Sequence, residues 1–235
     1  LVPAAAQIGR RFPSERKVVP DPVTGVPLTF LTSTPAGDSK IYPTHPQWTS
    51  DREWVVFRSN RVRGQALAVN ETTGDIVQIT EHGYIGMLSV GVKSMRLFHI
   101  RPVDRTPPAE AQGGERNRPR GPLQIVAIDL ARVFADSAAG AMKPAAEYEH
   151  VFGVIPETIA SGGDLAIDAT EDVAYFRVNR DEAAKHLAPG TKVESDFGPR
   201  NMGAGPTGIA KMDLKTGDVS VVVAVPFQVG HVQTN

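Results

Sequence analysis

Short apolar segments separated by polar turns recur along the chain. Polar residues 50–53 precede a β-branched and aromatic segment at 54–59, and a turn near Gly64 leads to a second apolar segment at 65–69. The sequence Thr-Gly-Asp then turns the chain into a third apolar segment, residues 76–80. Turn signals at this spacing predict an antiparallel meander of short strands.

The same order of turns and strands returns further along the chain. In one copy, residues 169–172 precede a strand at 173–178, and a second Thr-Gly-Asp turn, at 216–218, separates strands at 208–214 and 219–224. A weaker copy has residues 92–95 before strands at 96–101 and 123–130. The Thr-Gly-Asp turn therefore holds the same place within two units.

These repeats predict an all-β fold and, within it, a β-propeller. A sheet of three or four such strands cannot bury both faces alone, whereas sheets stacked around an axis bury them against one another. We expect residues 7–235 to form a partial propeller domain of about three blades and the start of a fourth. The alternative is a single β-sandwich whose hairpins are similar by accident, and the recurrent turn favours the propeller.

The segments between the repeats differ in character. Residues 102–122 are rich in Pro, Gly and Arg and predict a flexible surface loop, with a basic anion-binding loop as the alternative. Alanine-rich residues 131–149 predict a short helix, and residues 181–187 predict another that ends before Pro189. Near the N-terminus, residues 26–32 alternate in character and predict a short outer strand.

Composition narrows the classes of function. The chain has 235 residues and a formal net charge of -1, which argues against a nucleic-acid or membrane-surface binder. Cysteine is absent, so disulfides, thiolate zinc sites and cysteine nucleophiles are excluded. Residues 1–6 resemble the end of a signal peptide, and we expect a periplasmic or secreted protein. No stretch approaches the ~20 apolar residues of a membrane span.

Candidate chemistry rests on individual side chains, because the sequence carries no nucleophile elbow, phosphate loop or zinc-protease motif. The best candidate is His231, which follows a glycine where a fourth unit would begin its inner strand. The inner strands of a propeller line its channel, and an imidazole there suits a general base or a metal ligand. The alternative is a structural histidine that hydrogen-bonds to backbone at the start of a strand.

Two further sets of residues are candidates for binding. His45 lies at the equivalent point of the first unit, and Gln47 and Trp48 beside it suit a sugar ring; the alternative is a proline-flanked strand entry with packed aromatic rings. Arg200, in the glycine-rich segment 196–208, suits a carboxylate, which its two-pronged guanidinium can bind. The alternative for this segment is a simple turn. His99 lies within an apolar strand and is expected in the core.

Four motifs together carry a family resemblance: Asp-Pro-Val-Thr-Gly at 21–25, residues 42–48, Asp-Leu-Lys-Thr-Gly-Asp at 213–218, and Gly230-His231. The chain resembles the oligogalacturonate lyases, a family of seven-bladed propellers. The resemblance implies an enzyme of pectin degradation that cleaves uronate oligosaccharides by metal-assisted β-elimination, and it assigns the proton-abstracting base to His231.

The resemblance also implies parts that this chain does not supply. The metal would be divalent, with manganese expected, and its histidine and glutamine ligands would lie in later blades, beyond Asn235. An arginine that assists the base is expected before the Gly-His pair, where Arg200 is a candidate substitute. We therefore expect residues 1–235 to be inactive alone. A non-catalytic, TolB-like periplasmic propeller that binds other proteins is the alternative function.

Overall fold

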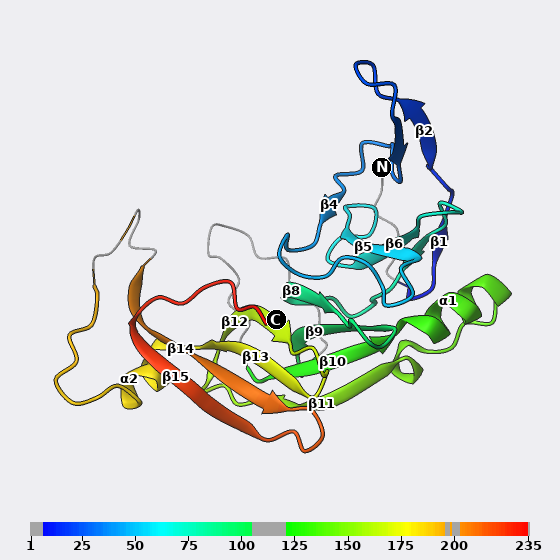
Figure 1. Ribbon diagram of the computed structural model, residues 1–235. Coiled ribbons are helices and arrows are strands. Elements are labelled where there is room, and N and C mark those ends of the chain that lie inside the picture. Colours follow the sequence, from blue (N-terminus) through cyan, green and yellow to red (C-terminus); the bar gives the residue numbers. More distant parts are fainter. Residues whose placement is uncertain (1–6, 105–120, 196–197, 199–202, 235) are drawn as a thin grey trace, which may run out of the picture. The chain divides into compact units, whose positions relative to one another are not determined.

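The computed structural model describes residues 7–104, 121–195, 198 and 203–234. Antiparallel sheets dominate this part of the chain, and its two α-helices lie in connections between strands (Figure 1). The predicted all-β class is confirmed. The chain divides into two compact units, the first built from Leu1–Gly83, Val90–Leu97 and Ile128–His150, and the second from Tyr84–Ser89, Phe98–Ala127 and Val151–Asn235.

The first sheet lies in the first unit and has the order β1-β7-β6-β5-β4. Its apolar side chains form a core in which Leu67 and Ile76 are inaccessible to solvent. The strands predicted at 54–59, 65–69 and 76–80 are all present in it. The sheet consists of β1 (Arg11–Phe12), β4 (Ser39–Lys40), β5 (Trp54–Arg58), β6 (Ala66–Asn70) and β7 (Ile76–Gln78).

The second sheet is a sequential meander of four strands in the order β11-β10-β9-β8. Two of its strands, β9 and β10, match the predicted segments 96–101 and 123–130. The other two were not predicted, because β8 contains Gly86 and Ser89 and β11 contains charged and exposed residues. The strands are β8 (Ile85–Val90), β9 (Arg96–Pro102), β10 (Leu123–Asp129) and β11 (Glu149–Ile155).

The third sheet lies in the second unit and has the order β12-β13-β14-β15. Along β13, Ala174, Phe176 and Val178 are buried, while the residues between them are half-buried. This period of two places every second side chain in the core. The strands are β12 (Ala160–Ile167), β13 (Val173–Val178), β14 (Ala204–Asp213) and β15 (Val219–Phe227).

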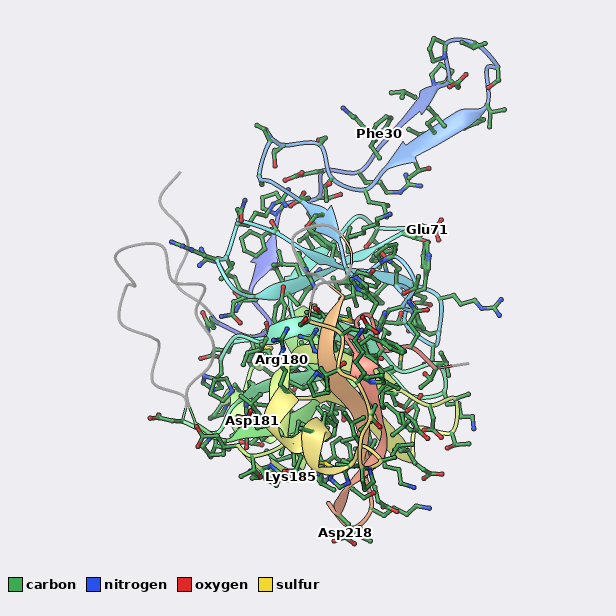
Figure 2. All side chains as sticks on the ribbon, turned by 90° about the vertical axis from the view of Figure 1, so that its left-hand side faces the viewer. Phe30, Glu71, Arg180, Asp181, Lys185 and Asp218 are labelled. Carbon is green, nitrogen blue, oxygen red and sulfur yellow. The ribbon has the colours of Figure 1, made fainter. Side chains whose placement is uncertain are left out.

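The N-terminal segment contributes a two-stranded ribbon, β2 (Lys17–Pro20) and β3 (Pro27–Phe30), whose residues are all exposed. The strand predicted at 26–32 is therefore present as β3, paired with β2. Figure 2 shows Phe30 on this ribbon, and the ammonium of Lys17 lies 5.2 Å from the centre of its ring.

Both predicted helices are present, and their caps follow from the sequence. Helix α1 (Leu130–Ala139) begins after Asp129, whose carboxylate accepts a hydrogen bond from the backbone N–H of Arg132, and ends at Gly140 with a left-handed φ of 65°. Helix α2 (Arg180–Lys185) is capped by the side chain of Asn179. A 3₁₀ turn spans Ala145–Glu147. Neither α-helix has the length to cross a membrane.

The Thr-Gly-Asp turn between β6 and β7 is held by its own side chains. The amide oxygen of Asn70 accepts hydrogen bonds from the backbone N–H groups of Thr72 and Thr73, at 3.0 and 2.9 Å. The hydroxyl of Thr73 donates to the carboxylate of Asp75. Gly74 takes a φ of 76°, a left-handed conformation that glycine adopts without penalty.

The turn between β14 and β15 repeats this arrangement. Asp213 accepts hydrogen bonds from the backbone N–H groups of Lys215 and Thr216, and the Thr216 hydroxyl donates to Asp218. Figure 2 labels Asp218, which lies at the turn that joins β14 to β15. In the β2–β3 ribbon, Asp21 makes the same bonds to the two residues before Gly25. The two Thr-Gly-Asp turns that recur in the sequence therefore also share one pattern of hydrogen bonds.

Three predictions fall wholly or partly outside the described residues. They are the signal-peptide remnant at 1–6, most of the loop at 102–122, and the segment around Arg200. The boundaries of the predicted propeller domain also stay a prediction.

Candidate functional site

The segment that follows β15 runs back across the third sheet, where Figure 1 shows it in red near β12. On one side of His231, the backbone N–H of Val229 donates to the hydroxyl of Thr207 at 2.6 Å. On the other side, the hydroxyl of Thr234 donates to the backbone carbonyl of Ile167, also at 2.6 Å. The segment is thus anchored to the sheet before and after His231.

His231 combines an exposed side chain with a fixed backbone. Its φ is 60°, in the left-handed region that residues with a Cβ rarely occupy. Its backbone N–H donates to the Oδ1 atom of Asp164 at 3.2 Å, and the next residue, Val232, is buried. A residue with a Cβ adopts this conformation seldom, and more readily where its surroundings support it. The contacts of its neighbours therefore determine where the imidazole is presented to solvent.

Asp164 connects His231 to an arginine. Its other carboxylate oxygen, Oδ2, lies 3.1 Å from the Nε atom of Arg177, and the two side chains are 11% and 23% exposed. The Nη1 atom of Arg177 lies 3.5 Å from the carbonyl oxygen of Val229, two residues before His231. The Asp164–Arg177 pair thus contacts the His231 segment at two points.

An irregular stretch of β12 lies beside this pair. The register between β12 and β13 shifts between Ala160 and Leu165, which includes Gly162 and Gly163. Gly162 has a φ of 122°, and a Cβ atom there would lie 3.2 Å from the Nη2 atom of Arg177. Bulges of this kind redirect side chains, and they are common beside active sites.

These groups offer two kinds of chemistry. The exposed imidazole of His231 can accept a proton from a bound molecule. The guanidinium of Arg177 can bind a carboxylate, and in this structure it binds that of Asp164. The arrangement therefore suits proton transfer by a histidine whose position is fixed by an ion pair.

The second predicted set lies in the first unit. His45 is buried, and its ring packs edge-on against Tyr42 with 5.7 Å between ring centres. The side-chain amide of Gln47 donates to the carbonyl of Tyr42 at 3.1 Å, and Trp48 is 40% exposed. His45 and Gln47 thus have structural contacts, while the indole of Trp48 is available to a ligand. A role of the three residues in sugar binding stays a prediction.

Two other histidines, His99 and His186, lie in the core and at the surface, respectively. His99 is buried in β9, as expected. His186 is exposed at the end of α2, where its Nε2 atom lies 3.1 Å from Glu182. Arg200 lies outside the described residues, so its contact with a substrate stays a prediction.

The described part of the chain contains no cluster of side chains that suits a metal ion. Within it, no three His, Asp or Glu side chains gather in an arrangement that could hold one.

Sequence reasoning missed Asp164 and Arg177. Asp164 follows two glycines inside a strand, and Arg177 interrupts an apolar strand, so each is locally unusual. Neither feature indicates a contact with His231, which is 67 residues from Asp164 in sequence. Only the antiparallel pairing and the returning segment bring the three together.

Comparison with solved structures relates the chain to known proteins. An oligogalacturonate lyase in complex with manganese matches with a TM-score of 0.63 at 16% identity, over 98% of this chain and 51% of that one. An oligogalacturonate lyase from Vibrio parahaemolyticus matches with a TM-score of 0.64 at the same identity and coverage. This chain has the fold of the oligogalacturonate lyases. The shared fold confirms the predicted propeller class.

The chain spans about half the length of the oligogalacturonate lyases it matches. A putative TolB from Agrobacterium tumefaciens aligns with a TM-score of 0.42 at 11% identity, over 80% of this chain and 52% of that one. No protein-family model matches the sequence, and no curated protein matches it significantly.

Proposed function

We propose that the complete protein is a polysaccharide lyase that cleaves uronate oligosaccharides derived from pectin by β-elimination. The observation that carries the proposal is His231, an exposed imidazole on a backbone fixed in a left-handed conformation. The fold shared with oligogalacturonate lyases over 98% of the chain supports the same substrate class.

The reaction assigns His231 a single task. Its imidazole takes the proton from C5, the carbon that bears the uronate carboxylate. Electrons from the C–H bond form a C4=C5 double bond, the C4–O4 bond breaks, and the departing oxygen takes up a proton. The products are one saccharide with a free hydroxyl and one with an unsaturated uronate end.

Negative charge grows on the uronate carboxylate as the C5 proton leaves, so a cation must stand beside it. We propose Arg200 for this contact. A divalent cation, manganese in the solved relative, belongs to the proposal for the complete protein, with ligands beyond Asn235. We also propose that the protein acts in the periplasm or outside the cell, where uronate oligosaccharides would reach it.

The test is the ultraviolet absorbance of the unsaturated product, recorded for the complete protein with oligogalacturonate and manganese. The variant His231→Asn removes the base, and it suits the site because asparagine tolerates a left-handed backbone. We expect the rate to fall about 10²–10⁴-fold, the usual contribution of a general base.

The matched control is His186→Ala, which removes an exposed imidazole of the same unit that makes a surface contact with Glu182. This variant should keep the wild-type rate. A wild-type protein that forms no unsaturated product, or a His231→Asn variant as active as wild type, would reject the proposal. The first result would favour a propeller that binds other proteins.

A further inference from the structure

We infer that Asp164 is a positioning residue for His231, and that Arg177 orients Asp164 for this task. The inference rests on the proposed function in one respect, namely that His231 is the base. It adds two residues that act on the base through its backbone.

The geometry forms a short chain of contacts. The backbone N–H of His231 donates to the Oδ1 atom of Asp164 at 3.2 Å, and the Nε atom of Arg177 lies 3.1 Å from the Oδ2 atom. Each carboxylate oxygen thus has its own partner. With a side chain only 11% exposed, Asp164 has little access to water as a substitute partner.

The chemistry of the two partners requires a carboxylate. Both the His231 N–H and the Arg177 Nε–H are donors, so the residue between them must accept at both of its ends. Aspartate has two acceptor oxygens, whereas asparagine has one acceptor and one NH₂ donor. Asparagine at position 164 could hold the backbone of His231, but its NH₂ group would face the guanidinium of Arg177.

The position of Arg177 on β13 explains how it reaches Asp164. Its neighbours Phe176 and Val178 point into the core, so Arg177 lies on the opposite, half-buried face. Gly162 leaves space beside the guanidinium, because a Cβ atom there would lie 3.2 Å from Nη2. A side chain at Gly162 would therefore crowd the guanidinium and make it shift slightly.

Loss of this support should affect catalysis more than binding. The left-handed conformation of His231 is unfavourable for a residue with a Cβ, so without Asp164 the backbone can relax toward an extended conformation. Its imidazole would then point elsewhere, and a displacement of about 1 Å at a reacting group can lower a rate about 10²-fold. Groups that bind the rest of the oligosaccharide would be unchanged.

The experiment compares Asp164→Ala, Asp164→Asn and Arg177→Lys in the complete protein, with kcat and KM measured separately. We expect Asp164→Ala to lower kcat about 10²-fold and to change KM by less than about threefold. Asp164→Asn, which keeps the acceptor for His231, should recover much of the lost kcat. Arg177→Lys should fall between wild type and Asp164→Ala.

The control for a merely structural effect is Asp168→Ala. Asp168 holds the turn between β12 and β13 by accepting hydrogen bonds from the backbone N–H groups of Asp172 and Val173. The Asp168→Ala variant should have a lower melting temperature than wild type. At temperatures where this variant is folded, its kcat should equal that of wild type. If Asp164→Ala behaves in the same way as Asp168→Ala, the positioning role is wrong.

The failures of the two proposals are distinguishable. If His231→Asn retains wild-type activity, His231 is not the base and the proposed function fails. If His231→Asn is inactive but Asp164→Ala has the kcat of wild type, the base is confirmed and the positioning role of Asp164 is rejected.

Discussion

The turn between β14 and β15 and the site around His231 lie in the same unit and are built in opposite ways. In the turn, Asp213 bonds to backbone groups two and three residues away. At the site, the residue that holds His231 is Asp164, 67 residues distant. In both, an aspartate accepts hydrogen bonds from backbone N–H groups. The difference lies in how far the donor residues are from that aspartate in the sequence.

This difference decides which substitutions the chain tolerates. A turn that is held by its own side chains can be changed with local consequences. A contact between distant segments depends on the register of the strands and on close packing of backbones. We therefore expect the largest effects where distant segments touch and the smallest within the turns.

The largest effect is expected at Gly163. A Cβ atom there would lie 2.5 Å from backbone atoms of Ile85 and Gly86, which cannot move aside as a side chain can. Gly163→Ala should lower the free energy of unfolding by about 3 kcal/mol, measured by urea denaturation. Gly230→Ala is the control, because a Cβ atom at Gly230 meets nothing within 4 Å. Equal stability of the two variants would contradict the close approach.

A second long-range contact, in the first unit, gives a prediction of pH dependence. Burial raises the pKa of Glu15, but the backbone N–H groups of Ser33 and Thr34 and the guanidinium of Arg61 together lower it from 4.5 to about 2. Its carboxylate therefore stabilises the fold above about pH 4.5, and this contribution disappears as the pH falls through about 2.

The measurement for this contact is the unfolding free energy of Glu15→Gln and wild type across that pH range. The variant should be less stable by about 2–3 kcal/mol near neutral pH, and the difference should shrink in acid. A difference that is independent of pH would show that the charge of Glu15 contributes nothing.

Two glycines at equivalent positions of two turns test whether packing against a neighbouring segment changes the cost of a substitution. Gly217 and Gly25 have φ values of 77° and 73°, so an alanine at either position is strained. A Cβ atom at Gly217 would also lie 2.9 Å from the carbonyl oxygen of Phe152, whereas one at Gly25 meets nothing within 4 Å. Thermal denaturation should show that Gly25→Ala costs about 1 kcal/mol and that Gly217→Ala costs more. The reverse order would show that the two turns do not differ in this way.

The smallest effects are expected from substitutions of the residue that accepts the hydrogen bonds of each Thr-Gly-Asp turn, Asn70 in one turn and Asp213 in the other. Asn70→Ala removes an acceptor for two backbone N–H groups and should cost about 1 kcal/mol. Asp213→Asn keeps that acceptor, as Asn70 shows, and should leave the melting temperature near neutral pH almost unchanged.

The same variant also carries a pH signature. Backbone N–H groups of Lys215 and Thr216 hold the pKa of Asp213 below its ordinary value. Acid should therefore weaken the turn in wild type, as the carboxylate is protonated, and should not do so in Asp213→Asn. A large loss at neutral pH in Asp213→Asn would indicate that the charge, and not the acceptor oxygen, holds the turn.

The parts of the fold that could be predicted from the sequence are those encoded locally. Apolar runs such as 54–59 and 173–178 predicted β5 and β13, and the Thr-Gly-Asp turns predicted where strands reverse. Strand β12 was missed because its glycines, which suit the bulge beside Arg177, weaken the strand signal. His231 was proposed from its place after a glycine, and its role stays a prediction. Its contact with Asp164 depends on strand pairing that no local pattern contains.

The most direct test of the central claim is amide hydrogen exchange at His231, followed by NMR in the complete protein with and without Asp164→Ala. The bond from the His231 N–H to Asp164 predicts a protected amide in wild type and exchange at least about tenfold faster in the variant. Protection at Val173, whose N–H bonds to Asp168, should be the same in both. An amide at His231 that exchanges equally fast in the two proteins would contradict the claim that Asp164 fixes this histidine.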